Sequence, residues 1–286
     1  MFDGVHLGHR SLIDEVCGVA SMRGYIPAVF TFDIHPLDIV APGRSPKLIC
    51  PLDRRIALLR DAGIAQIEVL RFDNDMRLLS AGDFMAMLRQ KYHVEALVIG
   101  FNHRFGHGAS GSFDEYRGIG NRTGIEVIQA KEYAKAGISS TAVRLMISQG
   151  DVGHAAALLG RPFRLTGIVE QGHRLGRTIG FPTANIHVDP RIILPAPGVY
   201  AAQAVLSDGA VWPAMVNVGV RPTVDRSPAP AVTVEAHIIG FSGDLYGKNI
   251  SLDFISFLRP EQRFESTDTL AVQLAADRDA VLKVIR

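Results

Sequence analysis

The sequence predicts an α/β domain built on a parallel sheet, followed by a compact antiparallel β-barrel with one C-terminal helix. Helix-like and strand-like segments alternate over residues 1–160, a pattern typical of a parallel sheet covered by helices. After residue 160, strand-like runs follow one another and a single helical segment comes last, which favours a barrel. A length of 286 residues suits two domains. We therefore expect domains at 1–160 and 161–286.

In the first half, helix and strand signals can be placed in order. Residues 52–62 are amphipathic and Gly63 follows as a stop signal. The expected helices are 10–23, 52–62, one capped by Ser80 with Asp83 three residues on, one capped by Ser139 or Ser140 and running to Gln149, and one from Asp151 to Gly160. The expected strands are 26–32, 66–71, 96–99 and 125–129.

In the second half, β-rich runs dominate. The expected strands are 163–169, 199–206, 210–218, 232–239 and 250–258. Ser207-Asp208-Gly209 is a tight-turn signal between two of them. Residues 266–283 are the one stretch with a helical pattern.

Composition and charge exclude several classes of protein. Lys and Arg number 30 against 29 Asp and Glu, so the basic excess of a nucleic-acid binder is missing. The two cysteines, Cys17 and Cys50, lack metal-ligand spacing, which indicates a reducing cytoplasm. The first four residues do not resemble a signal peptide, and no apolar run reaches the ~18 residues of a membrane span. We expect a cytoplasmic protein whose partners are small molecules, neither nucleic acid nor membrane.

The segment 176–186, GRTIGFPTANI, is the most informative of the chain. Thr183 and Asn185 are two residues apart, so in an extended segment their side-chain oxygens point to one side, where they can hold a hard cation. Gly176 and Gly180 allow the backbone to approach phosphates closely. The lysine of a Walker-type loop is missing. From spacing alone, an ordinary surface loop is the commoner explanation.

The string resembles the signature of riboflavin kinases. Five downstream strings agree with this resemblance in the family's order: 198–201 (GVYA), 216–223 (VNVGVRPT), 234–237 (VEAH), 245–247 (LYG) and 258–261 (LRPE). The resemblance implies that Gly176, Arg177, Gly180, Thr183 and Asn185 bind ATP phosphates, the last two also Mg²⁺. It implies that Glu235 is the general base, and that Asn217 and Arg259 bind flavin. Without the resemblance, Glu235 would be an ordinary strand residue and Arg259 a solvated charge.

The chain opens with FDGVHLGH, in which His6 and His9 lie where a loop turns into a helix. Free N–H groups at a helix start attract anions, and imidazoles can donate hydrogen bonds to phosphate oxygens. Two surface histidines are the plain alternative. A metal site is a weaker one, because no third ligand is evident.

This string resembles the HxGH motif of nucleotidyltransferases, in the variant of prokaryotic FAD synthetases. Three further strings agree: 31–36 (TFDIHP), 99–106 (IGFNHRFG) and 138–144 (ISSTAVR). The whole chain therefore resembles bifunctional riboflavin kinase/FAD synthetases, which implies a Rossmann-like HxGH nucleotidyltransferase domain before the riboflavin kinase barrel. Asn102-His103 departs from the Asp-Phe frequent in the family. A strand should also lead into FDGVHLGH, yet only Met1 precedes Phe2. We expect the lack of this strand to weaken the adenylyltransferase activity of the first half more than the kinase activity.

Two successive reactions are implied. Riboflavin takes the terminal phosphate of ATP to give FMN, and FMN then attacks the α-phosphorus of ATP to give FAD and pyrophosphate, with Mg²⁺ as cofactor. His6 and His9 would stabilise charge on the transferred phosphate. The leaving pyrophosphate would be held by Ser139, Ser140, Thr141 and Arg144, although these hydroxyls could simply cap a helix. Phe32 and Asn102 are the flavin-side candidates.

Three alternatives are compatible with the sequence. The chain could be a riboflavin kinase with an inactive adenylyltransferase half. It could be a non-catalytic flavin-binding protein, although storage needs no base such as Glu235. It could also be another nucleotidyltransferase, such as a pantetheine-phosphate adenylyltransferase, which the barrel half disfavours.

Overall fold

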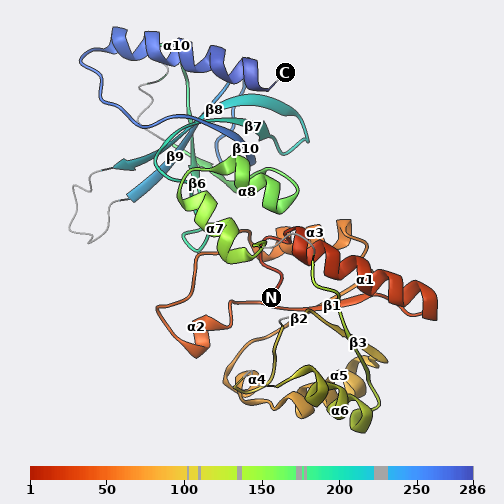
Figure 1. The fold of residues 1–286 in the computed structure, drawn as a ribbon. Coiled ribbons are helices and arrows are strands. Elements are labelled where there is room, and N and C mark those ends of the chain that lie inside the picture. Colours follow the sequence, from red (N-terminus) through yellow and green to blue (C-terminus); the bar gives the residue numbers. More distant parts are fainter. Residues whose placement is uncertain are drawn as a thin grey trace. The chain divides into compact units, whose positions relative to one another are not determined.

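A computed structural model of the chain describes residues 1–285 except 102, 109–110, 134–136, 172–175, 177–178 and 222–230. The chain forms two compact units, the first made of residues 1–46 and 51–138 and the second of residues 47–50 and 139–286 (Figure 1). Each unit has its own hydrophobic core.

The first unit alternates helices and strands, as predicted. Its helices are α1 (Leu7–Arg23), α2 (Leu37–Val40), α3 (Leu52–Asp61), α4 (Asn74–Leu78), α5 (Ala81–Tyr92) and α6 (Phe113–Thr123). Its strands are β1 (Ala28–Phe32), β2 (Gln66–Leu70), β3 (Ala96–Ile99) and β4 (Glu126–Gln129). The expected strand at 26–32 starts later because Pro27 has no N–H to donate to a ladder. Helices α2, α4 and α6 were not predicted.

All strand pairing in the described part of the first unit is parallel. It consists of two separate pairs, β1 with β2 and β3 with β4. Ala28 pairs with Gln66 at the start of one pair, and Ala96 pairs with Glu126 at the start of the other. The predicted parallel class is confirmed, although the expected continuous sheet is divided.

The second unit is a closed six-stranded antiparallel barrel, which confirms the predicted class. Its strands are β5 (Phe163–Glu170), β6 (Ala184–His187), β7 (Gly198–Val205), β8 (Val211–Arg221), β9 (Ala231–Ile238) and β10 (Asn249–Arg259), and they close in the order β10-β5-β6-β9-β8-β7. The helices of this unit are α7 (Ser140–Ser148), α8 (Val152–Leu159) and α10 (Thr267–Val284). Strand β6, inside the glycine-rich segment, was not predicted.

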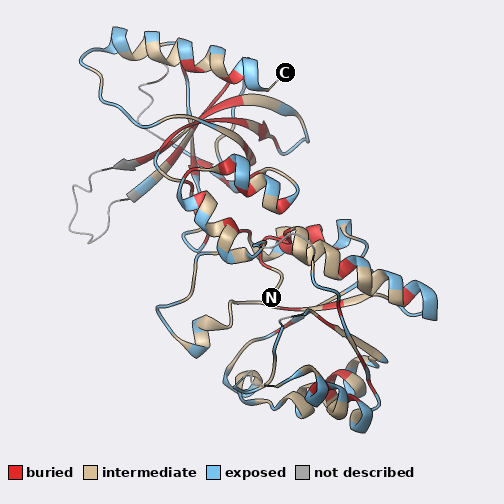
Figure 2. Ribbon diagram, in the orientation of Figure 1, coloured by how far each residue is buried: buried red, intermediate tan, exposed pale blue. Residues whose placement is uncertain are grey.

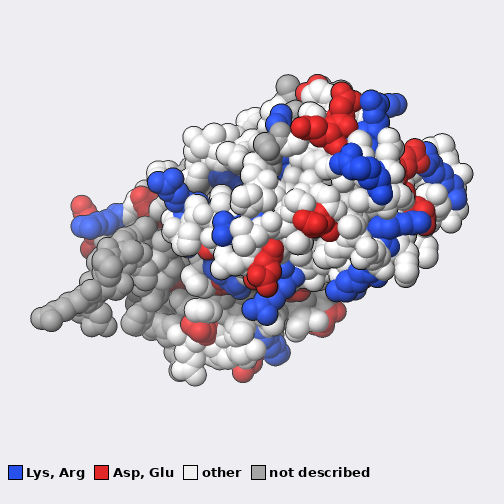
Figure 3. Space-filling model, turned by 90° about the horizontal axis from the view of Figure 1, so that it is seen from below, with Lys and Arg blue, Asp and Glu red and all other residues white. Residues whose placement is uncertain are grey.

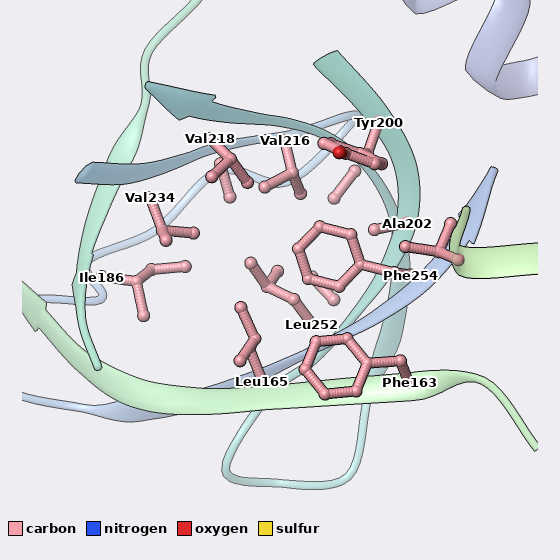
Figure 4. Packing of buried hydrophobic residues seen from close by; sticks show 14 of the residues in the cluster. Phe163, Leu165, Ile186, Tyr200, Ala202, Val216, Val218, Val234, Leu252 and Phe254 are labelled. Carbon is pink, nitrogen blue, oxygen red and sulfur yellow. The ribbon is translucent and has the colours of Figure 1, made fainter. Parts of the chain in front are cut away.

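The barrel interior is filled by apolar side chains from alternate positions of every strand. Figure 4 shows Phe163, Leu165, Tyr200, Leu252 and Phe254 pointing into this interior, and each is at most 1% exposed. The interior is therefore a packed core with no room for a ligand, as is usual for a small barrel. A functional site of this unit has to lie on the outside of the barrel or at its ends.

Helices α7 and α8 belong to the barrel by their packing. Val143, Ile147, Val152, Ala155 and Leu159 are part of the same buried cluster as the barrel interior. The long continuous part of the second compact unit consequently begins at Ser139, before the expected domain boundary at residue 160.

A second apolar layer lies outside the barrel under α10. It joins Val281 of α10 to Phe181, Val199, Ala201 and Met215, all buried. Buried residues concentrate on the barrel strands, whereas α10 is largely exposed or intermediate and has few buried positions (Figure 2). The C-terminal helix therefore covers part of the outer barrel wall.

Candidate functional site

Three predicted kinase residues lie in one row across the barrel wall. The antiparallel register sets Asn185 of β6 opposite Glu235 of β9, and Glu235 opposite Asn217 of β8. Directly opposed residues have Cβ atoms about 4.5–5.5 Å apart. Strand pairing thus brings together residues that are far apart in the sequence.

The row faces outward. The neighbouring positions Ile186, Val216 and Val234 point into the barrel core (Figure 4), and each is at most 6% exposed. Because successive side chains in a strand alternate between faces, Asn185, Glu235 and Asn217 lie on the outer face. All three are of intermediate exposure, and Thr183, two residues before Asn185, is exposed. A solute can reach this row.

The segment before Thr183 is anchored at two points. Phe181 N donates to Gly176 O over 2.8 Å, and a Cβ atom on Gly176 would lie 2.2 Å from Phe181 O. Only glycine fits this close approach. Gly180 has φ +81°, and Arg177 lies outside the described residues.

The other anchor is His237, two residues after Glu235 on the same face of β9. Its Nδ1 lies 2.8 Å from Pro182 O, and because a carbonyl oxygen only accepts, Nδ1 carries the proton. The ring also contacts Phe181 edge-on, with centroids 5.2 Å apart. The prediction of site residues overlooked His237, although it stands in the string VEAH that carried the resemblance.

Asn217 has a polar neighbour beyond the row. Its Nδ2 donates to Glu261 Oε1 over 3.3 Å. Gly219, two residues further on the same strand, leaves the space for this carboxylate, since a Cβ atom there would lie 2.6 Å from Glu261 Oε1. Glu261 was part of a quoted string but was not predicted to have a role.

Arg259 is tied to the C-terminal helix. Its Nε and Nη2 donate to the carboxylate of Asp277 on α10, the shortest contact being 2.7 Å. Its Nη1 donates to Pro260 O over 3.0 Å, and the guanidinium lies 5.8 Å from the Phe264 ring centroid. Arg259 therefore has a structural role in the protein itself, and its flavin-binding role stays a prediction.

In the first unit, the turn into α1 is strained around the two predicted histidines. Gly4 has φ +76° and Val5 has φ +39°, a left-handed conformation that is costly for a β-branched residue. His6 is the N-cap of α1, and its Nδ1 accepts from His9 N over 3.3 Å. The two imidazole rings stack with centroids 3.7 Å apart. A Cβ atom on Gly8 would lie 3.3 Å from His6 Nδ1, so the glycine gives that ring room.

The protonation of this pair follows from its contacts. Because His6 Nδ1 accepts a hydrogen bond, the proton of the neutral ring is on Nε2. Burial lowers the pKa of His9 well below its usual value, and the adjacent His6 lowers it further. The Nδ1 atom of His9 is buried without a hydrogen-bond partner in the described structure. The neutral ring of His6 can thus donate through Nε2, and burial favours the neutral form of His9.

The predicted pyrophosphate residues all lie at the start of α7. Ser139 is the N-cap and its hydroxyl accepts from Ala142 N over 3.1 Å. Ser140, Thr141 and Arg144 follow within the first turns, and Arg144 Nε donates to Lys47 O over 2.7 Å. These residues belong to the second compact unit, whereas His6 and His9 belong to the first.

Described residues of the loop at 99–106, the string that resembled the family's, line part of a cavity of about 220 Å³ at the carboxyl ends of β3 and β4. Ile99, His103, Arg104 and Gln129 are among its lining residues. Tyr116 fixes the loop: its hydroxyl donates to Phe105 O and accepts from Phe105 N, each over 3.0 Å.

Of the two residues of the first unit predicted to bind the flavin, only Phe32 is among the described residues. Asn102 lies outside the described residues. Phe32 ends β1, and its ring meets Phe72 edge-on at 4.9 Å between centroids.

Comparison with known proteins assigns a family to both halves. A family model described as riboflavin kinase matches residues 159–285, and one described as FAD synthetase matches residues 1–142. The bifunctional riboflavin kinase/FMN adenylyltransferase of Escherichia coli K12 is 35% identical over 96% of this chain and 88% of its own length. The chain belongs to the bifunctional riboflavin kinase/FMN adenylyltransferase family. The Bacillus subtilis member is 31% identical over 99% of this chain and 90% of its own.

The fold of this family member is also found in a solved structure. A crystal structure described as a macrolide-efflux protein from Streptococcus pneumoniae aligns with a TM-score of 0.88 and 29% identity, covering 98% of this chain and 91% of that one. In the described part of the present chain, no helix has the length and apolar character to cross a membrane. On the face shown in Figure 3, acidic and basic side chains are interspersed, in keeping with a net charge of +1.

Proposed function

We propose that this family member phosphorylates riboflavin to FMN with ATP and adenylylates FMN to FAD, releasing pyrophosphate. The observation that carries the proposal is the row Asn185–Glu235–Asn217 on the outer wall of the barrel. It places a carboxylate between two amides, and the exposed residue Thr183 lies two positions before Asn185. The two free cysteines, Cys17 and Cys50, support a cytoplasmic location for both reactions.

In the kinase half, Glu235 accepts the proton of the ribityl hydroxyl as that oxygen attacks the terminal phosphorus of ATP, and ADP leaves as its bond to that phosphorus breaks. A carboxylate within hydrogen-bond reach of the nucleophile is the simplest base for such a step. Gly176, Arg177 and Gly180 contact the ATP phosphates through the glycine-rich segment. Asn217 orients the flavin substrate, and Arg259 supports the flavin side from the end of β10.

The residues present suit Mg²⁺. Thr183 and Asn185 offer a hydroxyl and an amide oxygen, which are the hard ligands this ion prefers, and the Glu235 carboxylate beside them supplies negative charge. When bound, the ion neutralises charge on the triphosphate. Thr183 and Asn185 also orient that triphosphate toward the hydroxyl that Glu235 deprotonates.

In the adenylyltransferase half, His6 and His9 donate hydrogen bonds to the α-phosphate as negative charge develops. The strained turn at Gly4 and Val5 supports this role, since such strain is frequent at functional sites. Ser139, Ser140, Thr141 and Arg144 hold the pyrophosphate at the start of α7. Phe32 and Asn102 contact the flavin of FMN.

A second candidate is kinase activity alone. It is favoured by the division of the parallel strands into two pairs, because β1 and β3 each have one edge without a ladder partner among the described residues. Unpaired backbone groups of this kind cost about 1–3 kcal/mol each when buried.

One experiment separates the two candidates. The purified chain is incubated with riboflavin, ATP and Mg²⁺, and FMN is separated from FAD; a parallel reaction starts from FMN. Formation of both products supports the two-reaction proposal. FMN without FAD supports the kinase alone, and no product from either substrate contradicts both.

A further inference from the structure

We propose that Glu261 is a positioning residue of the kinase site, which holds the amide of Asn217 in one orientation beside Glu235. The inference rests on the proposed kinase function and extends it to a residue outside the nucleotide-binding segment. Its basis is the hydrogen bond from Asn217 Nδ2 to Glu261 Oε1, 3.3 Å long.

The bond decides which end of the amide meets the substrate. An asparagine amide has two donors on nitrogen and an acceptor on oxygen. Without a fixed partner, the group can rotate and present either end. Because the Glu261 carboxylate only accepts, it retains the nitrogen on its own side and directs Asn217 Oδ1 away from itself. Asn217 then offers an acceptor next to the Glu235 carboxylate that lies opposite it in the strand register.

The chain provides room for this contact. A Cβ atom on Gly219 would lie 2.6 Å from Glu261 Oε1 and 3.0 Å from Asn217 Nδ2. The backbone of Gly219 does not have the left-handed conformation that requires glycine, since it is not among the glycines with positive φ. The absence of a side chain is therefore explained by the Asn217–Glu261 contact rather than by backbone conformation.

The backbone next to Glu261 is also held in place by neighbouring contacts. It follows Arg259 by two residues, and Arg259 is held by the buried carboxylate of Asp277. Pro260 lies between them and its carbonyl accepts from Arg259 Nη1. The ion pair with α10 thus fixes the end of β10 from which Glu261 reaches Asn217.

The test compares FMN formation by Glu261→Ala, Glu261→Gln and Asn217→Ala, singly and as the double variant Glu261→Ala/Asn217→Ala. We expect Glu261→Ala to lower kcat about tenfold, the factor for one lost hydrogen bond at the reacting centre, with the KM for ATP unchanged. Glu261→Gln keeps an acceptor oxygen and should retain most of the activity. The double variant should be no slower than Asn217→Ala alone, because Glu261 acts through Asn217. Glu265→Ala, an exposed glutamate four residues on, is the matched control.

Three results would overturn the proposal: a Glu261→Ala variant as active as the wild type, a Glu261→Gln variant as slow as Glu261→Ala, or additive losses in the double variant. The wild-type control keeps the two proposals apart. If the unmodified chain forms no FMN, the kinase function fails; if it forms FMN while any of these three results is found, only the positioning role fails. Gly219→Ala should disrupt the same contact by placing a methyl group against the Glu261 carboxylate, and should lower kcat as much as Glu261→Ala does. Wild-type activity in that variant would count against the proposal.

Discussion

The ion pair between Arg259 and Asp277 should be the strongest single link between α10 and the barrel. Asp277 accepts from Arg259 through Nε and Nη2 and from Gln273 Nε2. The two charged side chains are 17% and 5% exposed. Replacing Asp277 by Ala leaves a largely buried guanidinium without its counter-charge, which typically costs about 3–5 kcal/mol. For a unit of this size, that loss lowers the melting temperature by about 6–20 °C.

The chain offers a suitable probe and a matched control. Its single tryptophan, Trp212, lies on β8 and packs edge-on against Phe241 with centroids 5.7 Å apart, so its fluorescence reports unfolding of the barrel. Asp279→Ala removes an exposed carboxylate from the same helix, where Asp279 and Arg278 are 57% and 42% exposed. An exposed pair of this kind contributes at most about 1 kcal/mol.

The measurement is urea unfolding followed by Trp212 fluorescence for the wild type, Asp277→Ala, Asp279→Ala and the double variant Arg259→Met/Asp277→Leu. We expect a large loss for Asp277→Ala, little for Asp279→Ala, and recovery of most stability in the double variant, in which no charge is left buried. If Asp277→Ala loses no more free energy of unfolding than Asp279→Ala, the reasoning about burial is wrong.

Three further predictions concern the two sites. Glu235→Gln should lower FMN turnover by about 10²–10⁴-fold while ATP binding by calorimetry is unchanged; turnover close to that of the Glu265→Gln control would make Glu235 a structural strand residue. Thr183→Ala and Asn185→Ala should weaken Mg²⁺-dependent ATP binding in the barrel and leave FAD formation from supplied FMN intact; loss of both activities in a folded variant would contradict two separate sites. The lowered pKa of His9 means that the unfolded chain takes up a proton near pH 6.5 while the folded state does not. The stability contribution of His9 is therefore present above that pH and declines below it, by up to ~1.4 kcal/mol per pH unit. The free energy of opening of β1, measured by hydrogen exchange at pH 7.5 and 5.5, should fall more between these pH values in the wild type than in His9→Gln. An equal fall in both proteins would refute this.

Local signals account for what the sequence predicted well. Ser80, Ser139 and Asp151 are N-caps of α5, α7 and α8 as expected, because a side-chain oxygen that satisfies a free N–H acts within one turn. The signal for α6 was present and overlooked, since Ser112 and Glu115 form a capping box in a segment with two glycines. Strand β6 was missed because it is four residues long and follows a glycine- and proline-rich stretch.

What the sequence by itself determined is the class of each half and the candidate residues for the chemistry, because motif strings, caps and alternating apolar positions are local properties. Only the tertiary structure decided that Asn185, Glu235 and Asn217 form one row, since the register of three strands depends on which side chains fill the closed barrel. It also brought His237, Glu261 and Gly219 to the predicted site residues, because each contacts a residue more than 40 positions away. The tertiary structure also decided that α7, which begins after Ser139, packs with the barrel, because its buried residues Val143 and Ile147 belong to the hydrophobic cluster of the barrel.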